Sequence, residues 1–181
     1  MAGALRLRAV RSGAGHSFSE STVSDWWLTK DGDVDCLALY ERHYLKRRYA
    51  EGRRVAQFVG PGEKVVLRTE QAEAMFVWRR FIDDCIDVRT GERQAGVNCA
   101  VFRNERPDRY RSSELVRQAD AIAVALWPDC RRYTYVDPTR VASGLPGACF
   151  LAAGWRYVRV GGHRARTKGG LLILERFQGA R

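Results

Sequence analysis

Three side chains suited to acid–base chemistry lie near the ends of predicted core elements. His43 lies in the stretch CLALYERHYLKRRY, and an imidazole titrates near neutral pH. Tyr135 and Asp137 close the run RYTYVDP, where a phenol ring can stack on a flat ligand and a carboxylate can accept a proton from an amine. These residue types are candidates for general acid–base chemistry, with His43, Asp137 or Glu105 as the proton acceptor. A surface histidine, a half-buried aromatic ring and a helix-capping aspartate are the plainer interpretation.

A second group of polar residues follows the apolar run Val97 to Phe102. Arg103 and Asn104 come directly after this predicted central strand, and Ser112 and Ser113 precede the helical pattern LVRQADAIAVAL. Ligands of α/β proteins bind at the carboxyl ends of strands, and a helix N-terminus favours an anion. We therefore expect Arg103, Asn104, Ser112 and Ser113 to bind a cofactor. For the two serines, a simple helix cap is the alternative.

The chain is strongly basic. It has 31 Lys and Arg against 21 Asp and Glu, a net charge of +10, with clusters at Arg42 to Arg54, Arg103 to Arg117 and Arg156 to Lys168. Such an excess suits a polyanion, either nucleic acid or a phosphorylated cofactor, although a solvated basic surface also fits. The residues that we expect to contact DNA are Arg47, Arg48, Arg164, Arg166 and Lys168.

Length and composition favour a single domain over residues 1–181. The chain has 181 residues and 45% hydrophobic residues, which is ordinary for a globular protein. No stretch is apolar enough to span a membrane or to act as a signal peptide, so we expect an intracellular protein without a membrane partner. The five cysteines are dispersed, which favours reduced thiols over disulfides or a zinc cluster.

The hydrophobic pattern predicts an α/β fold, a mixed central β-sheet with helices on both faces. The predicted strands are Ala4 to Val10, Val55 to Val59, Lys64 to Arg68, Ala74 to Ile82, Val97 to Phe102, Arg132 to Val136 and Gly170 to Phe177. The predicted helices begin at Ser24, Cys36, Ser112, Asp137 and Cys149, and an exposed hairpin tip is expected over Asp83 to Gly96. We expect Val97 to Phe102 and Arg132 to Val136 to be adjacent, parallel and splayed at their carboxyl ends.

Several stretches together resemble a known family. The order of elements is similar to the N-acetyltransferase (GNAT) fold. The pieces FVGPGEK, FVWRRF, VNCAVFRNE, SSEL, YTYVDP and CFLAAGW…TKGGLLILER resemble the Mom DNA-modification proteins of Mu-type phages and prophages. The resemblance runs from about His43 to Arg176. It implies an enzyme that converts adenine in double-stranded DNA to N6-carbamoylmethyladenine, protecting the DNA from restriction endonucleases in the cytoplasm of the host cell.

The resemblance also bears on residues and cofactors. The His43–Tyr44 pair resembles one in the family, which adds Tyr44 to the catalytic candidates. Acetyltransferases of this fold usually carry a glycine-rich loop that cradles coenzyme A, whereas the corresponding stretch here, RNERPDRYRSSE, has no glycine. An acyl-coenzyme A-dependent N-acyltransferase is therefore the alternative function, and the donor molecule stays open. Iron is implied by the resemblance alone, and would require His43 together with His16 or His163. The oligomeric state is open, a homodimer included.

Overall fold

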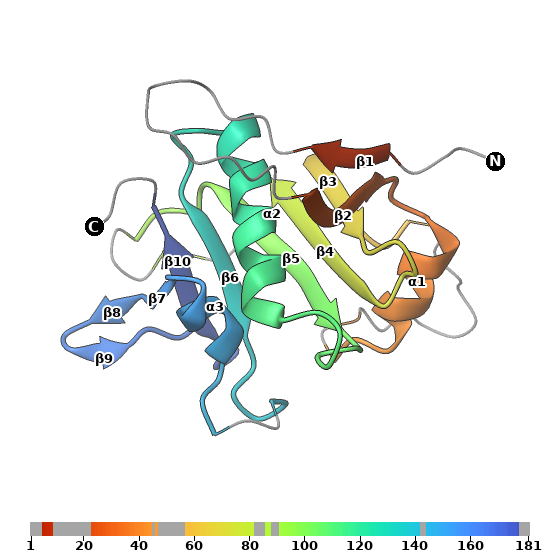
Figure 1. Cartoon of the computed structure of the whole chain (residues 1–181). Coiled ribbons are helices and arrows are strands. Elements are labelled where there is room, and N and C mark those ends of the chain that lie inside the picture. The colour runs from red at the N-terminus through yellow and green to blue at the C-terminus, as the bar shows by residue number, and fades with distance from the viewer. Residues whose placement is uncertain are drawn as a thin grey trace, which may run out of the picture.

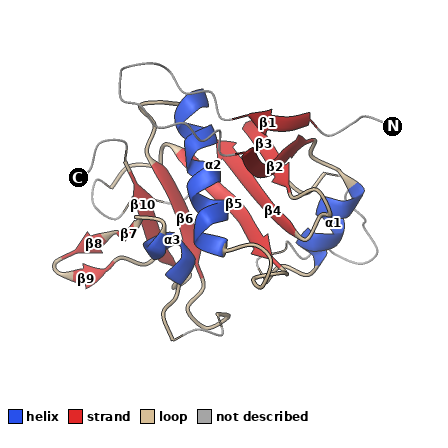
Figure 2. Ribbon diagram, in the orientation of Figure 1, coloured by secondary structure: helices blue, strands red, loops and turns tan. Residues whose placement is uncertain are grey.

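The computed structural model describes residues 5–8, 23–44, 46, 57–81, 86–87, 91–141 and 144–177, which form an α/β fold with one large mixed sheet (Figures 1 and 2). In chain order the elements are β1 (Leu5–Arg8), β2 (Val23–Thr29), α1 (Val34–Glu41), β3 (Glu63–Arg68), β4 (Ala74–Arg80), β5 (Val97–Asn104), α2 (Ser112–Leu126), β6 (Arg132–Val136), α3 (Ala148–Ala152), β7 (Arg156–Tyr157), β8 (Arg159–Val160), β9 (His163–Arg164) and β10 (Leu172–Arg176).

The strands of the large sheet lie in the order β1-β2-β3-β4-β5-β6-β10-β7, and β8 pairs with β9 in a separate hairpin. Neighbouring strands are antiparallel except β5 and β6, which are parallel. The predicted adjacency and parallel direction of these two strands are thus confirmed. The hydrophobic runs of β3, β4, β5, β6 and β10 were also predicted correctly as strands.

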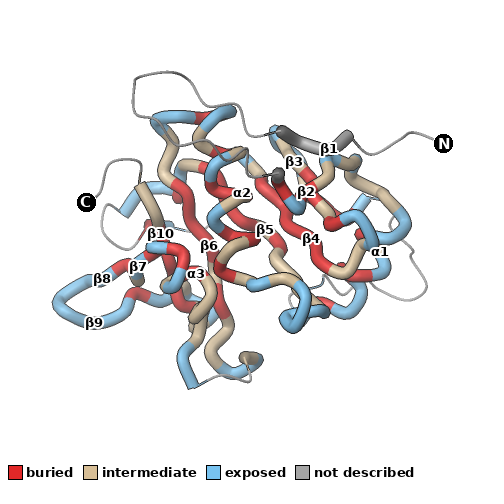
Figure 3. Tube along the Cα trace, in the orientation of Figure 1, coloured by how far each residue is buried: buried red, intermediate tan, exposed pale blue. Residues whose placement is uncertain are grey.

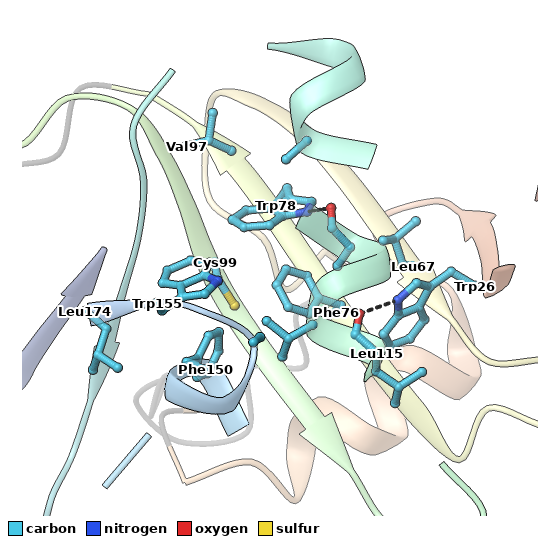
Figure 4. Close-up of a cluster of buried hydrophobic side chains, with 14 of the residues drawn as sticks. Trp26, Leu67, Phe76, Trp78, Val97, Cys99, Leu115, Phe150, Trp155 and Leu174 are labelled. Atoms are coloured by element: carbon cyan, nitrogen blue, oxygen red, sulfur yellow. Dashed lines mark hydrogen bonds between the residues drawn. The ribbon is translucent and has the colours of Figure 1, made fainter. Parts of the chain in front are cut away.

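The core forms on both sides of β4, because successive side chains of a strand point to opposite faces. Phe76 and Trp78 join one buried cluster with residues of α2, while Met75 and Val77 join a second cluster with residues of α1. Figure 3 shows that β4, β5 and β6 are buried along much of their length. Trp78 donates from Nε1 to the carbonyl oxygen of Ala119 at 2.9 Å, which fixes the sheet to α2 (Figure 4). These contacts hold α2 across the centre of the sheet.

Two predicted helices are wrong. The segment after Ser24 is strand β2, because Trp26 packs into the core and donates from Nε1 to the carbonyl oxygen of Leu115, while Leu28 is exposed. Asp137 starts a turn instead of a helix, since its carboxylate accepts hydrogen bonds from both the amide and the hydroxyl of Thr139. Such local side-chain bonds compete with the helix.

Other boundaries differ from the prediction. Helix α1 ends at Glu41, and the remainder of the predicted helix after Lys46 lies outside the described residues. No strand forms at residues 57–59, where the amides of Phe58 and Val59 donate to the carboxylate of Asp31. In the stretch expected to be an exposed tip, Gln94 is buried and bonded to Arg131. The short strands β7, β8 and β9 were not predicted.

Candidate functional site

The site begins where β5 and β6 separate. Their ladder pairs only Val97 to Cys99 with Arg132 to Thr134, and the hydroxyl of Thr134 donates to the carbonyl oxygen of Cys99 at 3.0 Å. On the other side of β5, Val101 pairs with Val77 and Cys99 pairs with Trp78, so Ala100 is an extra residue that forms a β-bulge. The predicted splaying thus begins after a ladder three residues long.

A small cavity fills the space between the two strands. Its volume is about 30 Å³, which holds one or two water molecules. It is lined by side chains from both faces of the sheet: Cys99, Phe102, Thr134, Val136 and Phe150 pack toward α2, and His43, Tyr44, Ala100, Val101 and Tyr135 line the rest. A cavity of this size admits the reacting atoms of a ligand but not a whole base or cofactor.

His43 is held in the cavity in its neutral form. It lies just after α1, is 6% exposed, and stacks on Tyr44 with ring centroids 4.6 Å apart. Its Nε2 lies 3.1 Å from the carbonyl oxygen of Phe102, which can only accept, so Nε2 carries the proton. Burial, together with the nearby Arg103, lowers the pKa of His43 to about 4. A proton taken up by this ring therefore goes to Nδ1.

Tyr44 and Asp137 meet at the edge of the cavity. Tyr44 is 38% exposed as a residue, yet burial of its hydroxyl raises its pKa to about 12, and the backbone amide of Asp137 faces that hydroxyl. The carboxylate of Asp137 accepts from the Thr139 hydroxyl at 2.7 Å and from its amide at 2.9 Å, and these bonds lower its pKa. Asp137 thus contacts Tyr44 through its backbone but does not itself line the cavity, and its carboxylate is engaged in the turn.

Arg103, which we expected to bind a cofactor, does not line the cavity. Its Nε lies 2.7 Å from a carboxylate oxygen of Glu105, and its Nη1 donates to the carbonyl oxygen of Arg42 at 2.7 Å. Glu105 also binds Arg42 at 2.7 Å, and the bonds to Arg42 and Arg103 lower its pKa to about 2. The carboxylate two residues along the chain thus holds Arg103 away from the gap.

The loop before α2 is closed on itself. The side-chain amide of Asn104 donates to the carbonyl oxygen of Tyr110 at 2.7 Å and to the hydroxyl of Ser112 at 3.0 Å. Arg111, not Ser112, is the N-cap of α2 and makes no side-chain cap bond, and Ser113 is buried. Asn104 and Ser112 therefore shape the loop, and the helix cap expected at the serines is wrong.

The arginines of the same loop are neutralised by neighbouring carboxylates. Arg106 pairs with Asp108 at 2.9 Å and with Glu73 at 3.0 Å, and Arg109 pairs with Glu73 at 3.0 Å. Ion pairs of this kind satisfy the guanidinium groups within the protein. These contacts do not support the expectation that this loop binds a phosphate.

The predicted DNA contacts fall in two places. Arg47 and Arg48 lie outside the described residues, whereas Arg164, Arg166 and Lys168 lie on or beside β9 and are exposed. His163 is also on β9, away from the cavity, and His16 lies outside the described residues. Within the described ranges, no group of three or more His, Cys, Asp or Glu side chains is suited to hold a metal ion, so these residues do not fit a protein-held iron.

Sequence reasoning predicted His43, Tyr44 and Tyr135 and missed the other cavity residues: Cys99, Ala100, Val101, Phe102, Thr134, Val136 and Phe150. Burial raises the pKa of the Cys99 thiol well above its usual value, so the thiol is protonated. Cys99 was interpreted as one of several buried thiols, and the four described cysteines are indeed free thiols. The available signal was the position of Thr134 between Tyr133 and Tyr135, in a strand whose carboxyl end was already expected to face the site.

Comparisons with known protein families, curated proteins and solved structures gave no significant match. Among the described residues no helix is both long and apolar enough to cross a membrane.

Proposed function

We propose that this protein modifies adenine in double-stranded DNA at N6, as do the Mom proteins that its motifs resemble. The observation that carries the proposal is the gap between β5 and β6, where neutral His43 and two tyrosines, Tyr44 and Tyr135, line one small cavity. A proton acceptor and aromatic surfaces are what an amine on a flat base requires. The net charge of +10 favours a polyanionic substrate.

The strand order supports a GNAT-like fold as part of the same proposal. A sheet that is antiparallel up to β5, a single parallel neighbour β6, and an antiparallel β10 beyond it support this part of the proposal, although the helix expected at Ser24 is strand β2. The two buried clusters, one with α2 and one with α1, are consistent with helices over both faces. We infer that donor and acceptor approach the gap from opposite faces of the sheet.

The chemistry follows from the protonation states. Adenine N6 lies inside the duplex, so the base must be extruded before it can react. The amino group then enters the cavity, N6 forms a bond to the methylene carbon of the donor, and the bond from that carbon to its leaving group breaks with its electron pair. N6 loses one proton, which the neutral ring of His43 accepts at Nδ1. In this proposal Tyr44 and Tyr135, which line the cavity, contact the extruded base.

The closed loop before α2 disfavours the alternative, an N-acyltransferase that uses acyl-coenzyme A. A pyrophosphate requires free backbone amides and uncompensated cations. Here Arg106 and Arg109 are paired with Asp108 and Glu73, and the stretch contains no glycine.

The proposal is tested by mass spectrometry of nucleosides from plasmid DNA of bacteria that express the protein. We expect N6-carbamoylmethyladenine with the wild-type chain and a loss of at least about 100-fold with His43→Gln. Gln keeps a donor for the carbonyl of Phe102 but cannot accept the proton. Lys46→Ala is the matched control, because Lys46 is near His43 in sequence but forms an exposed ion pair with Glu41. Unmodified adenine in cells that contain folded wild-type protein would contradict the proposal.

A further inference from the structure

The basic cluster from Arg156 to Lys168 differs from the basic cluster at Arg103 to Arg117 in how its charges are paired. From Pro138 to Leu174 the sequence contains no Asp or Glu, whereas the loop and helix start at Arg103 to Arg117 contain three. Arg159, Arg164, Arg166 and Lys168 form no ion pair with any described carboxylate, whereas Arg103, Arg106, Arg109 and Arg117 each pair with one. The four basic residues at 159–168 are therefore a group of described cations without a counter-charge, whereas Arg156 at the edge of the cluster pairs with Glu175 at 3.6 Å.

The geometry presents this charge to solvent. The hairpin of β8 and β9 turns at Gly161 and Gly162, whose φ angles of +54° and +83° fit the tight two-residue turn of such hairpins. Figure 1 shows that it extends beyond the β7 edge of the large sheet, and Figure 3 shows that it is exposed. Arg159 and Arg164 are directly opposite in register, so their side chains share one face.

The arginines of the hairpin are oriented without being neutralised. Arg159 donates to the carbonyl oxygen of Gly162 at 2.7 Å, and the guanidinium of Arg164 lies 4.2 Å from the ring centroid of Tyr157. Arg166 donates to the carbonyl oxygen of Gly170 at 2.9 Å. These contacts limit the freedom of each side chain and leave its full charge and its other N–H groups for an anion, which is the requirement of a phosphate contact.

The base of the hairpin is joined to the cavity. Val158 and Ala165 flank the hairpin and form a buried cluster with Ile173 of β10, and the amide of Val158 donates to the carbonyl oxygen of Ile173 at 2.9 Å. Tyr135 packs against this cluster and also lines the cavity between β5 and β6. The hairpin is thereby anchored to the sheet beside Tyr135, whereas Arg164 lies over Tyr157, which packs with the α2 cluster on the opposite face.

We propose that the β8–β9 hairpin is the element with which this protein grips the phosphate backbone of double-stranded DNA, through Arg159 and Arg164. This inference rests on the proposed function, since it takes duplex DNA as the partner. It assigns the contact to one exposed hairpin, and it excludes the Arg103 to Arg117 cluster from the described part of the DNA footprint.

The test is fluorescence anisotropy of the whole chain with a short labelled DNA duplex at increasing salt. Each lost phosphate contact lowers the slope of log affinity against log salt by about 0.9, so Arg159→Ala/Arg164→Ala should lower it by about 1.8 and weaken binding on the order of tenfold. Arg159→Lys/Arg164→Lys should keep the slope. Arg106→Ala/Arg109→Ala removes the same charge from ion-paired positions and should leave the slope unchanged.

Two outcomes would overturn the inference, and they differ from failure of the proposed function. If the wild type binds the duplex and the hairpin alanine variant has the same slope, the hairpin is not the DNA contact. If the Arg106→Ala/Arg109→Ala variant loses as much, the contact is not confined to the hairpin and the exclusion of the Arg103 to Arg117 cluster is wrong. A wild-type chain that does not bind the duplex at low salt would contradict the proposed function itself. Both hairpin arginines are exposed, so the melting temperature of the variants should equal that of the wild type.

Discussion

His43 combines two properties that distinguish it from a surface histidine. It is almost completely buried, and its Nε2 faces a backbone carbonyl at 3.1 Å, so the ring stays neutral over the whole physiological range. A neutral imidazole offers an acceptor lone pair at physiological pH, and the same burial that keeps it neutral makes it a weaker base than an exposed histidine. The neighbouring candidate, Asp137, is engaged through its carboxylate in the bonds from Thr139, which lower its pKa.

The burial of His43 predicts a dependence of stability on pH. The folded pKa of about 4 lies below the ordinary value of 6.5, so the unfolded chain binds the proton more tightly. Stability should fall as pH falls from about 6.5 to about 4, by roughly 3 kcal/mol at most from this residue. Urea unfolding at pH 7 and pH 4.5 measures it. His43→Gln should show a smaller loss between the two pH values, and an equal loss would show that the histidine is not buried in solution.

At the residue scale, the sequence could predict the position of a side chain only where no neighbouring group binds that side chain instead. The meeting of His43 with Tyr135 followed from the order of the elements and the parallel pair. Arg103 was placed wrongly because Glu105, two residues away, binds it. Cys99 and Thr134 were missed because both are ordinary residues for a strand. The local sequence gives no indication of the bulge at Ala100.

At the element scale, the gap depends on how β5 begins. Gly96 has φ +127°, and a Cβ atom added there would lie 2.3 Å from the carbonyl oxygen of Arg131. That carbonyl accepts the amide of Val97 at 2.8 Å, at the first step of the parallel ladder. Glycine is therefore required for β5 to approach β6 at all.

Gly96→Ala should consequently be far more costly than a substitution that only strains the backbone. Gly91 has φ +74° with nothing within 4 Å of an added Cβ atom, so Gly91→Ala isolates the conformational penalty. We expect a loss of about 1 kcal/mol for Gly91→Ala and at least about 3 kcal/mol for Gly96→Ala. Chemical denaturation measures both variants, and equal losses would contradict the close approach at Arg131.

Helices and strands were predictable where the hydrophobic periodicity of a segment and a structure-breaking residue at its end indicated the same element. Helix α2 has an apolar stripe and ends before Pro128, and β4 is a continuous β-prone run, so both were predicted close to their observed bounds. The segment with Trp26, Trp27 and Leu28 fits a helix or a strand equally well on local grounds. Packing of Trp26 against α2, a contact across 89 residues of sequence, decides for the strand.

At the scale of the whole molecule, one buried carboxylate connects three parts of the fold. Asp120 of α2 lies 3.2 Å from Arg132 of β6 and 2.9 Å from Arg176 of β10, and it accepts from the indole of Trp155 at 2.8 Å. Burial raises the pKa of Asp120 and lowers that of Arg132. Each charge is tolerated in the interior because the other is present.

Removal of this carboxylate should therefore destabilise the whole chain. Asp120→Ala leaves Arg132, which is 2% exposed, without its counter-charge, and we expect a loss of about 3–5 kcal/mol. Asp108 forms a comparable pair with Arg106 at the surface, so Asp108→Ala should leave the melting temperature unchanged. Differential scanning calorimetry compares the two, and a similar melting temperature for both variants would contradict a structural role for Asp120.

The short ladder between β5 and β6 has a further consequence. Three paired residues on each strand form the seam between two half-sheets, β1 to β5 on one side and β6, β10 and β7 on the other. A small molecule bound in the gap touches both half-sheets and acts as a bridge across the seam. Binding of this molecule then raises the free energy of unfolding of the whole chain, and the increase grows with the logarithm of the ligand concentration. Under the proposed function, thermal-shift screening of candidate donors therefore identifies those that bind the gap by a rise in melting temperature, without any DNA in the assay.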